Sequence, residues 1–179
     1  PLRRQRQMCI RDRKYDLENY NISQTYSQIS SYYINTNQPE KALEALKKAD
    51  ATAYSPTQKI SVQLEYVNYY SKFGDMQAAE KILNECKTAF DQDKRLWSIK
   101  KRLYNIEYVY YLQSKQYPKA LEAAKKQEAE ELNLSESIQN SVHYLTKGKI
   151  YSNMGNMSEA SKYLQMYIEA EDSLKIANE

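Results

Sequence analysis

The order of apolar and polar residues along the chain predicts a series of helices. Apolar or small side chains recur at helical intervals, as at Ala42, Leu46 and Ala49, while the positions between them are mostly polar. The chain contains only three Gly and four Pro, and these residues fall mainly where one periodic stretch ends and the next begins. We therefore expect an all-α protein whose helices are separated by short turns.

A tyrosine followed nine residues later by an alanine occurs four times in the same register. The pairs are Tyr33 and Ala42, Tyr70 and Ala79, Tyr111 and Ala120, and Tyr151 and Ala160. A Pro or a Gly lies inside each interval, so each interval joins the end of one helix to the start of the next. We expect about four helical hairpins, over residues 17–54, 55–91, 92–133 and 134–179. The four tyrosines are predicted to face the second helix of their hairpin. Tyr26, Ile29, Tyr32 and Tyr33 fall at helical intervals along one side of the first helix.

The repeat resembles the tetratricopeptide repeat. That family places a large residue first, a small residue four positions later, a tyrosine three after that and an alanine nine further on. Residues 144–160 contain the pattern as Tyr144, Gly148, Tyr151 and Ala160, and the first hairpin contains it at residues 26–42. The small position is Val67 in the second hairpin and Tyr108 in the third. The resemblance implies a right-handed α-solenoid with helices longer than in the family's usual repeat.

The net charge of +3 arises at the amino terminus. Residues 1–13 contain five Arg and one Asp, and the remainder of the chain is nearly balanced. This segment resembles a translated sequencing adapter, so we expect it to be a non-native or disordered tail ahead of a repeat domain at 14–179; a basic arm for nucleic acid or a membrane surface is the alternative. Leu174 and Ile176 still carry apolar surface without a following helix to cover it, which predicts that the chain is a fragment of a longer protein.

The sequence offers no set of residues suited to catalysis. The single histidine, His143, has no cysteine or acidic partner at a suggestive spacing, and no phosphate-binding glycine loop or zinc motif is present. We predict no catalytic residue, no cofactor and no metal, and therefore no enzyme. Cys86 continues the small-residue stripe of its helix and is predicted to be buried, while Trp97 is predicted to cover a seam between hairpins.

By resemblance to the family, the first helices of the hairpins line a groove that binds a partner. The positions that would face it are polar with some apolar residues: Ser27, Ser31, Leu64, Asn68, Lys72, Asn105, Val109, Leu145, Lys149 and Asn153. This mixture suits an extended peptide or a helix of another protein. We therefore expect a non-catalytic interaction scaffold with a protein or peptide partner, no nucleic acid, and no membrane link other than through missing flanking sequence.

Two other functions fit the pattern. The array resembles the input region of bacterial membrane-linked signalling or transcription regulators, whose output domain would then be missing. An RNA-binding helical repeat is the third hypothesis, but the tyrosines are predicted to be in the core and no basic stripe runs along the chain. The composition is compatible with either a cytoplasmic or a periplasmic location.

Overall fold

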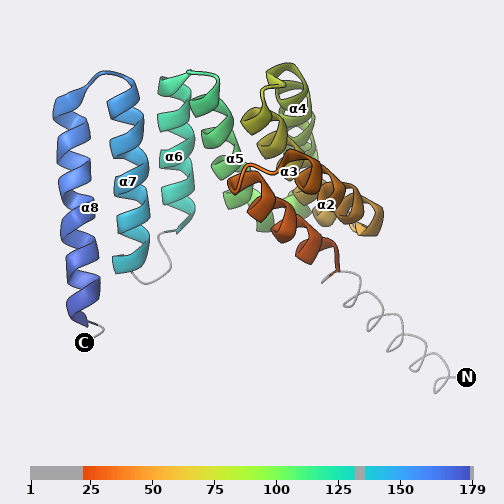
Figure 1. Ribbon diagram of the computed structural model, residues 1–179, viewed down its shortest axis with the longest axis horizontal. Helices are drawn as coiled ribbons and strands as arrows, with labels where there is room; N and C mark the ends of the chain where they lie inside the picture. Colours follow the sequence, from red (N-terminus) through yellow and green to blue (C-terminus); the bar gives the residue numbers. More distant parts are fainter. Residues whose placement is uncertain (1–21, 132–135, 178–179) are drawn as a thin grey trace, which may run out of the picture. The chain divides into compact units, whose positions relative to one another are not determined.

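The computed structural model describes residues 22–131 and 136–177 of the chain, and within these ranges it contains helices and no strand (Figure 1). The first helix spans residues 22–35. The others are α2 (Pro39–Thr52), α3 (Pro56–Phe73), α4 (Met76–Gln92), the 3₁₀ helix η1 (Lys94–Ile99), α5 (Lys100–Gln113), α6 (Tyr117–Glu131), α7 (Glu136–Asn153) and α8 (Met157–Ala177). The expected all-α fold is confirmed.

The helices form two compact units, each built from two hairpins. The first unit ends at Ile99 and holds the hairpin of helix 22–35 with α2 and the hairpin of α3 with α4, followed by η1. The second unit begins at Lys100 and holds α5 with α6 and α7 with α8. Because each helix packs on its neighbour in the sequence, each unit has the architecture of an all-α solenoid.

The four hairpin turns place a left-handed residue at the same position of the repeat. This residue follows the register tyrosine by four positions in every hairpin. Its φ is positive in each case: Asn37 (59°), Gly74 (98°), Lys115 (59°) and Gly155 (76°). A left-handed residue stops a helix and reverses the chain, so the repeat in the sequence is also a repeat of backbone geometry.

Hydrogen bonds across the turns satisfy carbonyl groups at the helix ends. In the first hairpin the Gln38 N–H donates to the Tyr33 carbonyl at 2.9 Å, and in the fourth the Asn156 N–H donates to the Tyr151 carbonyl at 3.0 Å. The third hairpin has the same bond between Gln116 and Tyr111, at 2.8 Å. This spacing is that of the Schellman motif, so the register tyrosine always supplies one of the last carbonyls of its helix.

The side chains around the turns are of two kinds, which alternate. In the first turn Gln38 Nε2 donates to Thr36 Oγ1 at 2.9 Å, and Lys41 Nζ donates to Gln38 Oε1 at 2.8 Å. The third turn repeats both bonds, with Ser114, Gln116 and Lys119. The second and fourth turns instead have Gly followed by a helix N-cap, Asp75 or Asn156. Each compact unit therefore contains one turn of each kind, in the same order.

The first helix packs on α2 through serines. Ser23 Oγ donates to the Ala49 carbonyl at 2.9 Å, and Ser30 Oγ donates to the Ala42 carbonyl at 3.1 Å. Both serines are buried, whereas Ile29 is exposed on another side of the helix. The stripe of Tyr26, Ile29, Tyr32 and Tyr33 expected from the spacing is therefore not the buried side of the helix, because Ile29 and Tyr32 are exposed. The small serines take the interior positions, where their hydroxyls bond facing carbonyls and allow the two backbones to approach closely.

The four register tyrosines are half-buried rather than fully enclosed. Lys41 Nζ lies 5.6 Å from the centre of the Tyr33 ring, and Lys119 lies 5.5 Å from that of Tyr111. The Tyr151 ring stacks on Tyr163 with centres 5.5 Å apart. These rings thus combine partial burial with contacts to a lysine or another aromatic ring, as amphipathic aromatic side chains commonly do.

At Gly148, α7 packs closely against Leu164 of α8. A Cβ atom added at this position would lie 2.8 Å from Leu164 Cδ2 and 2.9 Å from Leu164 Cγ. Both distances are shorter than carbon atoms tolerate without movement. The family's small residue is therefore required at this position by the packing of the fourth hairpin.

Replacing Lys115 by glycine is expected to stabilise the protein by about 0.5–1 kcal/mol, because glycine adopts positive φ without a Cβ clash. Gly74→Ala should lower the free energy of unfolding by about 1 kcal/mol, because it adds a Cβ at a residue with positive φ. Asn37→Gly is the matched control and should change stability less than Lys115→Gly, since asparagine tolerates this conformation better than lysine. Urea unfolding followed by circular dichroism measures all three, and destabilisation by Lys115→Gly would contradict the assignment.

Gly148→Ala should destabilise the protein by about 1–2 kcal/mol, as the clash with Leu164 outweighs the better helix propensity of alanine. In a double-mutant cycle with Leu164→Ala, the cost of Gly148→Ala should shrink because the clashing atoms are gone. If thermal or urea unfolding shows that the two substitutions lower the free energy of unfolding additively, the two positions do not interact.

Candidate interaction surface

In the first unit, two of the predicted groove residues meet on a carboxylate that sequence reasoning did not identify. Ser31 Oγ donates to Glu65 Oε1 at 2.6 Å, and Asn68 Nδ2 donates to the same oxygen at 3.0 Å. Glu65 is only 3 % exposed. A buried carboxylate requires such donors, so Glu65 joins helix 22–35 to α3 and fixes the positions of Ser31 and Asn68. Lys72 follows Asn68 by one helical turn and is exposed.

In the second unit, Tyr108 of α5 is in contact with Thr146 of α7. Burial raises the pKa of Tyr108, and a hydrogen bond with the Thr146 side chain lowers it in part. The predicted positions on these helices flank this contact: Asn105, Val109, Leu145 and Lys149. Asn105 and Lys149 are exposed, while Val109 and Leu145 are half-buried. The surface of this unit therefore combines polar groups with partly covered apolar ones.

The remaining predicted positions divide between surface and interior. Asn153 is exposed and its Nδ2 donates to the Lys149 carbonyl at 2.8 Å. Ser27 is 3 % exposed and Leu64 is 0 % exposed, so both lie in the packed interior. Ser27 belongs to the serine stripe that faces α2, and Leu64 lies on the buried side of α3. The candidate positions that remain at least partly exposed are, in the first unit, Ser31, Asn68 and Lys72, and, in the second unit, Asn105, Val109, Leu145, Lys149 and Asn153.

An ion pair inside the second unit holds α7 in place behind this surface. Lys147 Nζ lies 2.6 Å from Glu128 Oε2 of α6, and the Lys147 side chain is largely buried. The same ammonium lies 5.4 Å from the centre of the Tyr163 ring of α8. One lysine therefore contacts both helices that flank α7, which restrains the helix that carries Leu145 and Lys149.

The side chains considered for chemistry lie in packed positions. Cys86 is buried, as predicted, and burial together with the nearby Glu85 charge raises the pKa of its thiol to about 12. A thiol with this pKa remains protonated at neutral pH and is a poor nucleophile. His143 is also buried. Among the described residues, no three His, Cys, Asp or Glu side chains gather closely enough to hold a metal ion.

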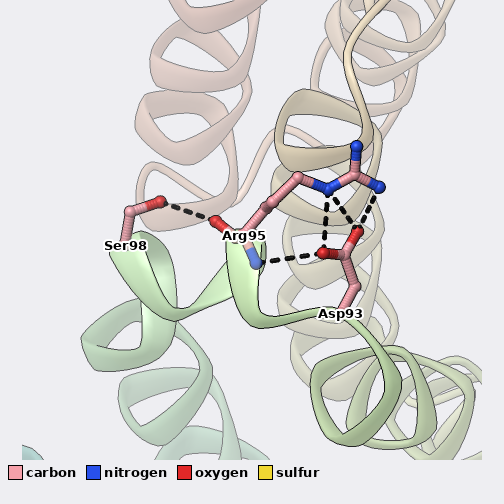
Figure 2. Close-up of polar contacts among 3 residues, drawn as sticks. All are labelled: Asp93, Arg95 and Ser98. Carbon is pink, nitrogen blue, oxygen red and sulfur yellow. Dashed lines mark hydrogen bonds and ion pairs between the residues drawn. The ribbon is translucent and has the colours of Figure 1, made fainter.

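The short helix η1, which ends the first unit, is fixed by an ion pair and hydrogen bonds between Arg95 and Asp93. Arg95 donates from its backbone N–H and its guanidinium to Asp93, with Nη2 at 2.7 Å from Oδ2, and Ser98 Oγ donates to the Arg95 carbonyl (Figure 2). These bonds lower the pKa of Asp93. Trp97 in the same short helix is 56 % exposed, beneath the ammonium of Lys94. The expectation that Trp97 covers a seam was wrong, since most of its side chain is on the surface.

The fold and this surface define a helical-repeat domain. The family model of 26S proteasome subunit RPN7 matches residues 7–126, which is more than half of the chain, and the chain therefore belongs to that family. A tetratricopeptide repeat model matches residues 144–173, within the fourth hairpin. No curated protein and no solved structure matches the chain. Within the described ranges, no helix is both long enough and apolar enough to cross a membrane.

These matches refine the resemblance found in the sequence. The tetratricopeptide pattern is confirmed for the hairpin that contains Tyr144, Gly148 and Tyr151. The RPN7 family was not anticipated, and its match covers the hairpins in which the small position is Val67 or Tyr108. The match also covers the first hairpin, which keeps a small residue, Ser30, at this position.

Replacing Glu65 tests whether it organises the surface of the first unit. Glu65→Leu should destabilise the protein by about 1–3 kcal/mol, because Ser31 and Asn68 lose their shared acceptor. Glu65→Gln retains an acceptor oxygen of the same shape and should cost less. Urea unfolding of the two variants checks this order, and equal costs would show that the hydrogen bonds do not matter.

Proposed function

We propose that this chain is a non-catalytic protein-interaction scaffold that binds a peptide or a helix of a partner along the first helices of its hairpins. Membership of a family described as a subunit of the 26S proteasome supports this proposal, because a subunit acts through contacts with other proteins in an assembly. The tetratricopeptide match in the fourth hairpin supports it as well, since stacked helical hairpins present extended surfaces to partners.

The observation that carries the proposal is the pair of exposed lysines at the surface positions. Lys72 on α3 and Lys149 on α7 are exposed, and neither ammonium has an ion-pair partner among the described residues. Each lysine is four positions from an asparagine of the same set, Asn68 or Asn153. Asparagine can bond the backbone of an extended peptide, and a lysine without a partner favours a nearby carboxylate.

The apolar positions beside the lysines indicate a second property of the expected partner. Val109 and Leu145 are half-buried, so each still offers apolar surface next to Lys149 or Asn105. A peptide that combines acidic side chains with one or two apolar side chains would match both features. The partner is therefore proposed to be an acidic, partly apolar segment of another protein.

A charge-reversal experiment tests the proposal. The complete chain is used to capture partners from the lysate of the source cells, and the captured proteins are identified by mass spectrometry. The double variant Lys72→Glu and Lys149→Glu should lose the specific partner, with affinity reduced by about tenfold or more because each reversed charge repels the acidic segment.

The control is a second double variant that changes the net charge by the same amount, with both substitutions on other helices. Lys47 on α2 and Lys125 on α6 are exposed, and Lys47→Glu with Lys125→Glu should leave the affinity unchanged. Equal loss of the partner in both double variants would indicate a non-specific charge effect. Retention of the partner by the Lys72 and Lys149 variant would refute the proposed surface.

A further inference from the structure

Val142 is an exposed apolar residue on the same side of α7 as the candidate positions of that helix. It is 56 % exposed. At about 100° of rotation per residue, Leu145 and Lys149 lie within about 60° of Val142 around the helix axis. His143 and Lys147, which come between these positions in the sequence, are buried on other sides of α7. Val142 therefore extends the candidate surface of the second unit, although the family pattern did not point to it.

The first helices of the other three hairpins have polar residues where α7 has Val142. Val142 precedes the register tyrosine of its hairpin by nine positions. The equivalent residues of the other first helices are Gln24, Ser61 and Arg102. Leu145, six positions before the tyrosine, is half-buried, whereas the equivalent Leu64 of α3 is fully buried. Among these described positions, α7 therefore has the pair of apolar side chains that a partner can reach.

The exposed side of α7 changes from apolar to basic along the helix. Lys149 follows Val142 by seven residues, or about 10 Å along the helix axis. Leu145 and Thr146 face the same way between them, and neither is charged. Lys149 has no ion-pair partner among the described residues, so its ammonium favours a carboxylate from another molecule. A complementary segment has an apolar side chain and a carboxylate about 10 Å apart.

The polar residues of this surface favour an extended segment over a helical one. Asn105 and Asn153 are exposed, and the side-chain amide of asparagine can both donate to and accept from a peptide backbone. A bound helix has its backbone groups bonded internally, whereas an extended segment leaves them available. Residues three positions apart in an extended chain are separated by about 10 Å, which matches the distance from Val142 to Lys149.

We infer that the partner binds the second unit through an extended segment in which an aliphatic residue precedes or follows an acidic residue by three positions. The aliphatic side chain packs on Val142 and Leu145, and the carboxylate pairs with Lys149. This inference rests on the proposed function and adds to it the residue spacing of the partner and the role of Val142. The first unit has no equivalent apolar contact, because Ser61 is polar and Leu64 is buried.

Selection from a random peptide library displayed on phage tests this inference, with the complete chain as the immobilised target. The enriched peptides should carry an aliphatic residue and an Asp or Glu three positions apart. Each enriched peptide is then synthesised with a fluorescent label, and fluorescence anisotropy measures its affinity for the chain. Val142→Ser should weaken binding by about three- to tenfold because the aliphatic contact is lost. Lys149→Glu should weaken it by about tenfold or more because the new charge repels the carboxylate.

Two variants serve as controls. Ile168→Ser removes a similarly exposed apolar side chain, 51 % exposed, from α8 and should leave the affinity unchanged. Val142→Leu retains an apolar side chain at the proposed contact and should bind the peptides like the unmodified chain. Circular dichroism checks that every variant remains helical, as expected for substitutions at exposed positions.

Three results would overturn the inference. They are unchanged affinity in Val142→Ser, enrichment of peptides whose apolar and acidic residues are seven positions apart as on a bound helix, and enrichment of no peptide at all. The scaffold proposal is judged separately, by the protein captured from cells and its loss in the Lys72→Glu and Lys149→Glu variant. Failure of this inference and failure of the scaffold proposal are therefore distinguishable.

Discussion

The left-handed residue four positions after each register tyrosine is the constraint on which the hairpins depend. It ends the first helix, allows the tyrosine carbonyl to accept a hydrogen bond from the turn, and starts the second helix so that the register alanine becomes buried. Once the turn is fixed, the relative register of the two helices is fixed as well. The positions of Ser30 opposite Ala42 and of Gly148 against Leu164 follow from it. The same geometry is built with glycine in two hairpins and with Asn37 or Lys115 in the others, so the backbone conformation is retained even where the side chain disfavours it.

Small and polar side chains, rather than large apolar ones, set how helices 22–35 and α2 pack. Serine hydroxyls that bond the carbonyls of α2 are satisfied in the interior and bring the two helices together. This arrangement moves Ile22, Ile29 and Tyr32 to the opposite side, where they remain exposed. The exposed side of this helix also carries Gln24, Gln28 and Asn35, so it is uncharged and mixed in polarity rather than apolar.

The features readable from the sequence were those that depend on local spacing. The intervals between Tyr and Ala, the breaks at Pro39 and Gly74, and the small-residue stripe ending at Cys86 predicted helices, turns and one side of the core. Interactions between helices were not readable in this way. Glu65 was not singled out because its two donors, Ser31 and Asn68, lie on two different helices. The hydrogen bonds of Ser23 and Ser30 to α2 were not expected for the same reason. The groove positions were assigned from a standard repeat, and the helices here are longer, so Ser27 and Leu64 fall inside.

The two kinds of hairpin turn alternate along the chain, and neither family match describes this regularity. The first and third turns share a Gln bridge between a hydroxyl and a lysine, and the second and fourth share Gly followed by an Asx cap. The boundary between the compact units, at Ile99, separates one such pair of hairpins from the other. The chain therefore consists of two related double hairpins, each carrying its own part of the candidate surface, with Lys72 in one and Lys149 in the other. Under the proposed function, a contact made by one double hairpin would raise the local concentration of the partner at the other, so the two contacts would reinforce each other.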